Sequence, residues 1–99
     1  IDRNVRRREG EVDLVAVDPR GTLPVLVFVE VKIRRPRVTG RAIESLSQRK
    51  QQRLRALAEA YASEHPELPA DLRIDLVAID LTSDGAVEAV THVENAVEG

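Results

Sequence analysis

Asp13, Glu30 and Lys32 are the residues of this 99-residue chain whose types and spacing could carry out chemistry. Glu30 and Lys32 follow an apolar run that starts at Val25, and residues two apart in a strand project from the same face of a sheet. A hairpin between the two strands would place Asp13 beside Glu30. Two adjacent carboxylates repel each other, and a divalent cation stabilises such a pair. Hard oxygen ligands favour Mg²⁺ or Mn²⁺.

A salt bridge from Lys32 to Glu30 or to Asp13 is the alternative interpretation, and it needs no metal ion. Either way, a charge buried in a central strand without a partner is costly, so these side chains must be paired. Glu11 shares the face of Asp13 and is either a further residue lining the site or a solvated residue at the sheet edge.

Basic residues are concentrated in one segment, although the whole chain has a formal net charge of −2. Residues 32–55 contain nine bases and one acid, and residues 56–99 contain one base and ten acids. The basic segment is either a solvated loop and helix face or a phosphate-binding surface. With one Phe and one Tyr in the chain, base stacking is a poor candidate, so we expect contacts with the nucleic-acid backbone. The candidate contacts are Arg6, Arg34, Arg35, Arg41, Lys50 and Arg53.

Two further polar residues, Lys50 and Gln51, lie near the start of a predicted helix and could line the same site. The chain has no cysteine, so it has no disulfide, zinc–thiolate site or cysteine nucleophile. His92 is expected to form a structural hydrogen bond and His65 to lie in a surface loop. The sequence pattern offers no His and acid as partners for a serine, so it does not indicate a nucleophilic triad. It also contains no Gly-rich loop of the kind that binds phosphate.

The elements that position these residues follow from periodicity and turn chemistry. Residues 11–17 alternate as a strand, with Val12, Leu14 and Ala16 on one face and Asp13 and Val15 on the other. The segment Asp-Pro-Arg-Gly at 18–21 predicts a turn, and residues 25–32 predict a central strand paired with the first. Residues 33–46 are expected to form a loop with one helical turn.

A long helix capped by Ser47 is predicted to run to about residue 64, because Leu54, Leu57, Ala58 and Tyr61 have helical spacing. Strands are predicted at 73–81 and 87–93. A strand, a helix and another strand form a crossover, which makes the third strand parallel to the second. The predicted class is α/β, with a mixed sheet in one domain that spans residues 1–99.

Composition and length fit a small domain with an aliphatic core, since 42% of the residues are hydrophobic. No apolar run is long enough to span a membrane and no signal peptide is visible, so we expect a cytoplasmic protein with no membrane partner.

The motif Asp13…Glu30-Val31-Lys32 resembles the PD-(D/E)xK signature of restriction-endonuclease-like folds and Holliday-junction resolvases. The chain is similar over nearly its whole length to the bacterial YraN-like family, whose members are predicted nucleases. The matching segments are NVR (4–6), GEVDLVA (10–16), VFVEVK (27–32) with Arg34, GRAIES (40–45), KQQRL (50–54), RIDLVAI (73–79) and HVENA (92–96).

This resemblance implies a restriction-endonuclease-like core and a metal-dependent mechanism. Asp13, Glu30 and the Val31 main-chain carbonyl would bind Mg²⁺ or Mn²⁺, and Lys32 would act on the attacking water or on the phosphate charge. The resemblance also implies a further N-terminal helix with a Gly-Glu pair, which is expected to be missing here, and an aromatic residue in place of Val5 and of Val97. It makes a homodimer plausible.

The expected function is therefore hydrolysis of DNA phosphodiester bonds by a metal-dependent endonuclease, with a preference for particular DNA structures or junctions. The alternatives are a nucleic-acid-binding module of the same fold with little or no catalysis, and a protein-interaction domain that presents its basic surface to an acidic partner.

Overall fold

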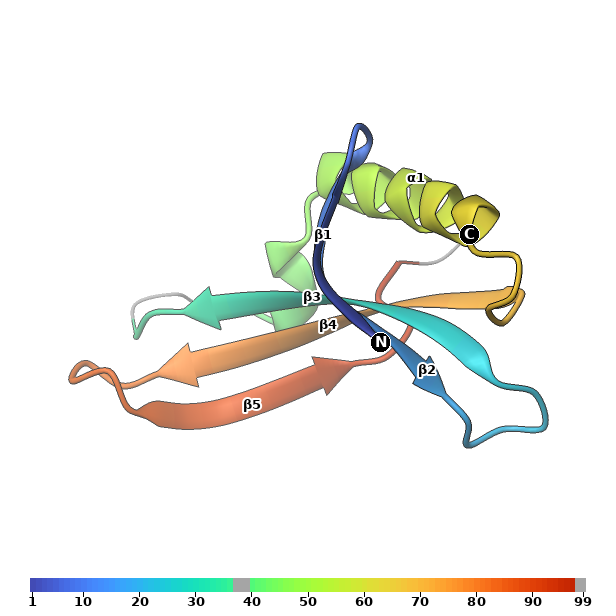
Figure 1. Cartoon of the computed structure of the whole chain (residues 1–99). Helices are drawn as coiled ribbons and strands as arrows, with labels where there is room; N and C mark the ends of the chain where they lie inside the picture. The colour runs from blue at the N-terminus through green and yellow to red at the C-terminus, as the bar shows by residue number, and fades with distance from the viewer. Residues whose placement is uncertain (37–39, 98–99) are drawn as a thin grey trace.

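The computed structural model describes residues 1–36 and 40–97, which form a mixed five-stranded sheet crossed on one face by a long helix (Figure 1). The strands lie in the order of the chain, β1-β2-β3-β4-β5. This arrangement confirms the α/β class and the crossover helix. The elements are β1 (Asp2–Arg7), β2 (Gly10–Asp18), β3 (Val25–Arg34), the 3₁₀ helix η1 (Ala42–Ser45), α1 (Gln48–Glu64), β4 (Asp71–Leu81) and β5 (Val87–Val93).

The predicted parallel pairing is confirmed, because β3 and β4 run side by side from Val25 opposite Asp71 to Arg34 opposite Asp80. The other neighbouring strands are antiparallel. β3 is central and apolar, with Leu26, Val27 and Phe28 buried, as expected for a strand that is paired on both edges. Glu30 follows these residues on the same strand.

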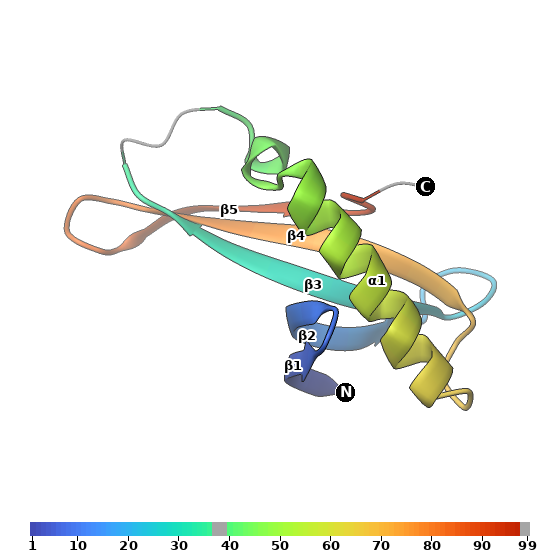
Figure 2. The same ribbon diagram turned by 90° about the horizontal axis from the view of Figure 1, so that it is seen from above.

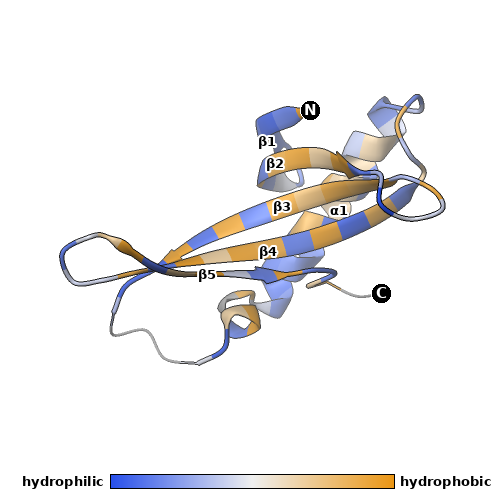
Figure 3. Ribbon diagram, turned by 90° about the horizontal axis from the view of Figure 1, so that it is seen from below, coloured by the Kyte–Doolittle hydropathy of each residue, from blue (hydrophilic) through white to orange (hydrophobic). Residues whose placement is uncertain are grey.

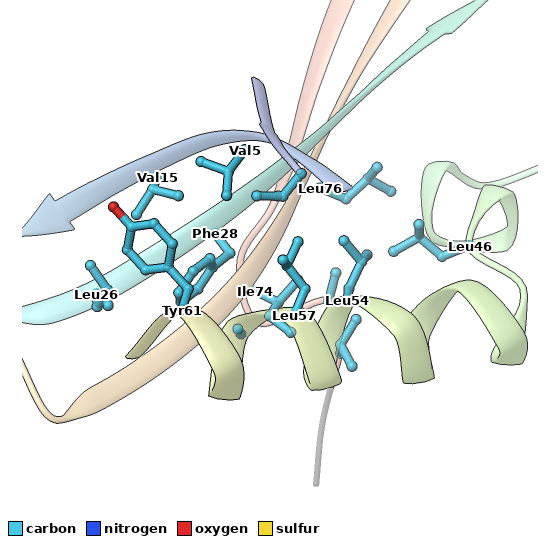
Figure 4. Packing of buried hydrophobic residues seen from close by; sticks show 14 of the residues in the cluster. Val5, Val15, Leu26, Phe28, Leu46, Leu54, Leu57, Tyr61, Ile74 and Leu76 are labelled. Carbon is cyan, nitrogen blue, oxygen red and sulfur yellow. The ribbon is translucent and has the colours of Figure 1, made fainter. Parts of the chain in front are cut away.

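Helix α1 begins after Ser47, whose side chain accepts a hydrogen bond from the Lys50 N–H at 3.2 Å. This cap satisfies one of the free N–H groups of the first turn. The apolar stripe Leu54, Leu57, Ala58 and Tyr61 is buried, as the spacing predicted. Figure 4 shows Leu54, Leu57 and Tyr61 packed against residues from the sheet. The Phe28 and Tyr61 rings meet edge to face, with their centroids 5.6 Å apart.

Strand β1 was not predicted, and it explains an error in the predicted alternation of β2. Val5 is its only buried residue and pairs with Val12. Asn4, at φ 51°, bends the hairpin between the pairs Arg3–Leu14 and Val5–Val12. Val12 and Val15 are therefore buried together, whereas the pattern had placed Val12 with Leu14 and Ala16, which are exposed. Beyond the bend the hairpin leaves the sheet and rises toward the start of α1 (Figure 1).

The helix covers one face of the sheet, and Figure 2 shows it crossing obliquely above β3 and β4. The opposite face has no helix over it in Figure 3, where apolar and polar bands alternate along the strands. No helix in the described ranges is long and apolar enough to cross a membrane.

Candidate metal and phosphate site

A cavity of about 680 Å³ opens between the tip of the β1–β2 hairpin and the first turns of α1. Its lining combines three acidic and five basic residues with Gly10, Ser47 and Leu54. The acids are Glu11, Asp13 and Glu30, and the bases are Arg6, Arg7, Arg49, Lys50 and Arg53. The bend in the hairpin creates this cavity by bringing the Arg6–Glu11 region to the helix start.

Asp13 lies where β2 separates from β3. The last residue of β2 paired with β3 is Leu14, opposite Val29. The next N–H of β3 on this side, that of Val31, therefore lacks a backbone partner in β2, and it donates to Oδ2 of Asp13 at 2.6 Å. A charge-assisted hydrogen bond of this kind fixes the carboxylate beside Glu30.

Glu30 is a largely buried acid, with 8% of its surface exposed. Burial raises its pKa, and a hydrogen bond to the Asp13 carboxyl raises it further, whereas the positive charge of Lys50 lowers it. The net effect is a pKa of about 7. The raised pKa means that the fully ionised pair, with two negative charges in contact, is disfavoured, and that positive charge beside the pair would favour its full ionisation.

Lys50 supplies part of that charge, because its Nζ lies 3.3 Å from Oε2 of Glu30. The Lys50 side chain is 43% exposed and that of Glu30 only 10%, so the ammonium lies on the solvent side of the pair. The first turn of α1 contains no acidic residue, although acids are favoured there by the helix dipole. Arg49 and Lys50 occupy that turn instead.

The basic wall of the cavity includes both paired and unpaired side chains. Arg7 is held by Glu64 at 2.8 Å, and Arg6 forms an exposed pair with Glu11 at 3.3 Å. Within the described ranges, Arg49 and Arg53 form no ion pair. Gly10 faces Arg53, since a Cβ at Gly10 would lie 3.7 Å from that of Arg53. The wall thus has two cations free to meet an anionic ligand.

The structure does not bring all of the sequence candidates to the cavity. Lys32 is exposed on β3, two residues beyond Glu30, and does not line it. Gln51 donates its amide to the Leu46 carbonyl at 3.0 Å and lies outside the lining. Arg34 is bound through two nitrogens to Asp80, at 2.6 and 3.0 Å. Arg35 and Arg41 are exposed and also lie outside the lining.

A second charged cluster, which the sequence reasoning missed, surrounds Asp75 on β4. Asp75 is only 1% exposed, and it accepts hydrogen bonds from Arg73, from His92 Nε2 at 2.8 Å and from the Asn95 N–H at 3.0 Å. Burial alone would raise the pKa of Asp75, but these hydrogen bonds outweigh it and hold the pKa below its usual range. His92 therefore makes the structural hydrogen bond that was expected.

Asp75, His92 and Glu94 could hold a metal ion, since their ligand atoms lie within 4.8 Å of one another. Their present partners compete with that role. An ionised carboxylate only accepts, so Nε2 of His92 must carry the proton in its bond to Asp75. Arg73 bonds both oxygens of Asp75, and Glu94 pairs with Arg20 at 2.6 Å. The oxygens of Asp75 are thus already hydrogen-bonded within the cluster, whereas Glu30 contacts a second carboxyl group and one ammonium.

Several residues of the cavity were not among the sequence candidates: Gly10, Arg7, Ser47 and Arg49. Arg49 could have been found from its position beside Lys50 in the first turn of a capped helix. The role of Arg7 depended on strand β1, whose sequence has no apolar alternation to reveal it.

The sequence of the chain is similar to those of several known proteins. Residues 1–79 match the Uncharacterised protein family UPF0102. A UPF0102 protein from Desulforamulus reducens is 36% identical over 98% of this chain and 78% of its own length. A UPF0102 protein from Frankia alni is 42% identical over 97% of this chain and 76% of its own length. The chain therefore belongs to the UPF0102, or YraN-like, family, whose fold is restriction-endonuclease-like.

Proposed function

We propose that this protein is a metal-dependent endonuclease that hydrolyses DNA phosphodiester bonds. The observation that carries the proposal is the pairing of two carboxyl groups, Asp13 and Glu30, in a cavity whose walls hold five bases. Acidic ligands next to a basic wall suit a substrate that is itself a polyanion and needs a divalent cation at its reacting phosphate.

The donor set fits Mg²⁺ or Mn²⁺. Asp13 and Glu30 offer hard carboxylate oxygens, the two fully ionised carboxylates would carry one more charge than the Lys50 ammonium balances, and the Val31 main-chain carbonyl would be the third donor. When bound, the ion supplies Lewis acidity at a phosphate oxygen and a water of lowered pKa. Glu11 is the third acid of the cavity lining, and in the metal-free protein it forms an exposed ion pair with Arg6.

The remaining residues orient the DNA backbone. Arg49 and Arg53, which are unpaired among the described residues, would neutralise phosphates on either side of the reacting bond. Lys32 lies outside the cavity lining but on the same face of β3 as Glu30, and we assign it to the attacking water or to charge on the phosphate oxygens. We further propose that the protein is cytoplasmic. It would act as a homodimer on branched or otherwise structured DNA.

The test is cleavage of single-stranded, duplex and branched DNA with Mg²⁺ or Mn²⁺. Wild type should cut at least one substrate, and Asp13→Asn and Glu30→Gln should each lose the activity. Glu88→Gln is the matched control, because it makes the same change at an exposed residue of β5 outside the cavity. If wild type cleaves none of these substrates with either ion, the proposed endonuclease activity is refuted.

Binding separates the two alternatives that lack catalysis. A nucleic-acid-binding module would retain DNA with an affinity that falls as salt rises, whereas an interaction domain for an acidic protein would not. Arg53→Met should reduce the salt dependence of DNA binding by about one counterion. If the DNA affinity of Arg53→Met depends on salt as steeply as that of wild type, Arg53 does not belong to the DNA interface.

A further inference from the structure

Lys50 is the cavity residue whose position the metal site does not explain. It stands at the third position of α1, where its backbone N–H is bound by Ser47 and the helix dipole disfavours a positive side chain. Arg49 stands beside it in the same turn. Residues that break a local rule without a local compensation tend to mark functional positions.

The compensation for Lys50 lies across the cavity, in Glu30. The 3.3 Å contact joins a half-exposed ammonium to a buried carboxylate that also contacts Asp13. A divalent cation bound by Glu30 would compensate the carboxylate charge that the Lys50 ammonium compensates in the metal-free protein. The two cations cannot both be the close partner of one carboxylate oxygen without strong mutual repulsion.

We propose that Lys50 is a positioning residue that exchanges partners, holding the Glu30 carboxylate in the metal-free protein and moving to a substrate phosphate when Glu30 binds a divalent cation. This inference rests on the proposed function. A substrate phosphate in the cavity would give the ammonium its second partner, because Lys50 lines that cavity with Arg49 and Arg53 and the N-terminus of α1 also favours phosphate there. The exchange replaces one ion pair by two and involves no covalent step.

Lys32 provides a natural comparison, since it and Lys50 are the only two lysines in the chain. Lys32 is exposed, lies outside the cavity lining, and has no ion pair within residues 1–36 and 40–97. Isotope-labelled lysine therefore gives two side-chain ammonium signals in NMR spectra, each assignable by substitution of one lysine.

The first experiment follows these two signals in chelator and during addition of Mg²⁺. Glu30→Gln should shift the Lys50 signal in the metal-free protein and leave that of Lys32 nearly in place. Mg²⁺ added to wild type should move the Lys50 signal in the same direction. The partner exchange would be overturned if the chemical shift of the Lys50 ammonium is the same in Glu30→Gln as in wild type. It would also be overturned if that chemical shift does not change while calorimetry records Mg²⁺ binding.

The second experiment measures Mg²⁺ affinity and DNA cleavage in Lys50→Met. Loss of the competing ammonium should tighten Mg²⁺ binding by up to about fivefold, while cleavage slows because the phosphate loses a cation. Lys32→Met should not tighten Mg²⁺ binding, and Lys50→Arg should restore an affinity close to that of wild type. Weaker Mg²⁺ binding in Lys50→Met would indicate a merely structural role and contradict the proposal.

The two proposals fail in different ways. If calorimetry detects no Mg²⁺ or Mn²⁺ binding to wild type, the nuclease proposal fails and the partner exchange fails with it. If the metal binds and wild type cleaves DNA, but the Lys50 signal and the affinity of Lys50→Met are unaltered, only the partner exchange is wrong.

Discussion

The raised pKa of Glu30 predicts that the metal-free protein becomes less stable as the pH rises. The ordinary pKa of this carboxyl is 4.5, and the folded protein raises it to about 7. Between these values the folded state keeps a proton that the unfolded state has released. The free energy of unfolding therefore contains a favourable contribution that is fully present below about pH 4.5 and is lost as the pH rises through about 7.

The magnitude follows from the size of the shift. Each pH unit corresponds to about 1.4 kcal/mol, so this group should lower the free energy of unfolding by about 2.5 kcal/mol between about pH 5 and about pH 8. No large discount for solvent applies, since the Glu30 side chain is only 10% exposed. The groups that face it are Asp13, which raises the pKa, and Lys50, which lowers it.

The assay is urea unfolding in chelator, followed by far-ultraviolet circular dichroism because the chain contains no tryptophan. Glu30→Gln should remove the pH-dependent term, so that the difference between wild type and Glu30→Gln changes by about 2.5 kcal/mol across this pH range. Glu88→Gln, an exposed acid on β5, should follow wild type. Parallel curves for wild type and Glu30→Gln would refute the assignment of the buried proton to Glu30.

Three shorter predictions concern the scaffold, and each is measured by urea unfolding. Arg73→Met leaves the Asp75 carboxylate buried without its main partner and should cost about 3–5 kcal/mol; a cost below about 1 kcal/mol would show that His92 and the Asn95 N–H suffice. Ser47→Ala removes the α1 cap and should cost about 1 kcal/mol, whereas no loss would mean that water replaces it. Leu57→Ala opens a cavity under α1 and should cost about 2–5 kcal/mol, and a smaller value would indicate that the helix collapses onto the sheet.

The regular elements were predictable where one periodicity dominates. The α1 stripe and the Ser47 cap defined the helix, and the apolar run of β3 defined the central strand. Strand β1 was not predictable in this way, because Val5 is its only buried residue and its pairing with Val12 is a tertiary effect. The bend at Asn4 also follows from no local pattern, since Asn tolerates positive φ without requiring it.

The candidate site was predictable to the extent that strand pairing controls it. Asp13 and Glu30 meet because the hairpin places Leu14 opposite Val29. The basic side chains were less predictable, because a long flexible residue takes the nearest acid that the fold presents. Arg34 thus pairs with Asp80, which comes from a strand far away in the sequence, and could not be distinguished from Arg53 by charge alone.

The two buried acids of the sheet show how a site can be separated from a structural network. Asp75 is the more deeply buried, yet its oxygens are satisfied by Arg73, His92 and a backbone N–H, and its pKa is lowered. Glu30 has a neighbouring carboxyl, a single half-exposed ammonium and a raised pKa. Depth of burial alone therefore does not separate a candidate site acid from a structural one. The partners do: Asp75 is hydrogen-bonded to three donors, whereas Glu30 contacts a second carboxyl group and borders a cavity in which Arg49 and Arg53 have no ion pair within residues 1–36 and 40–97.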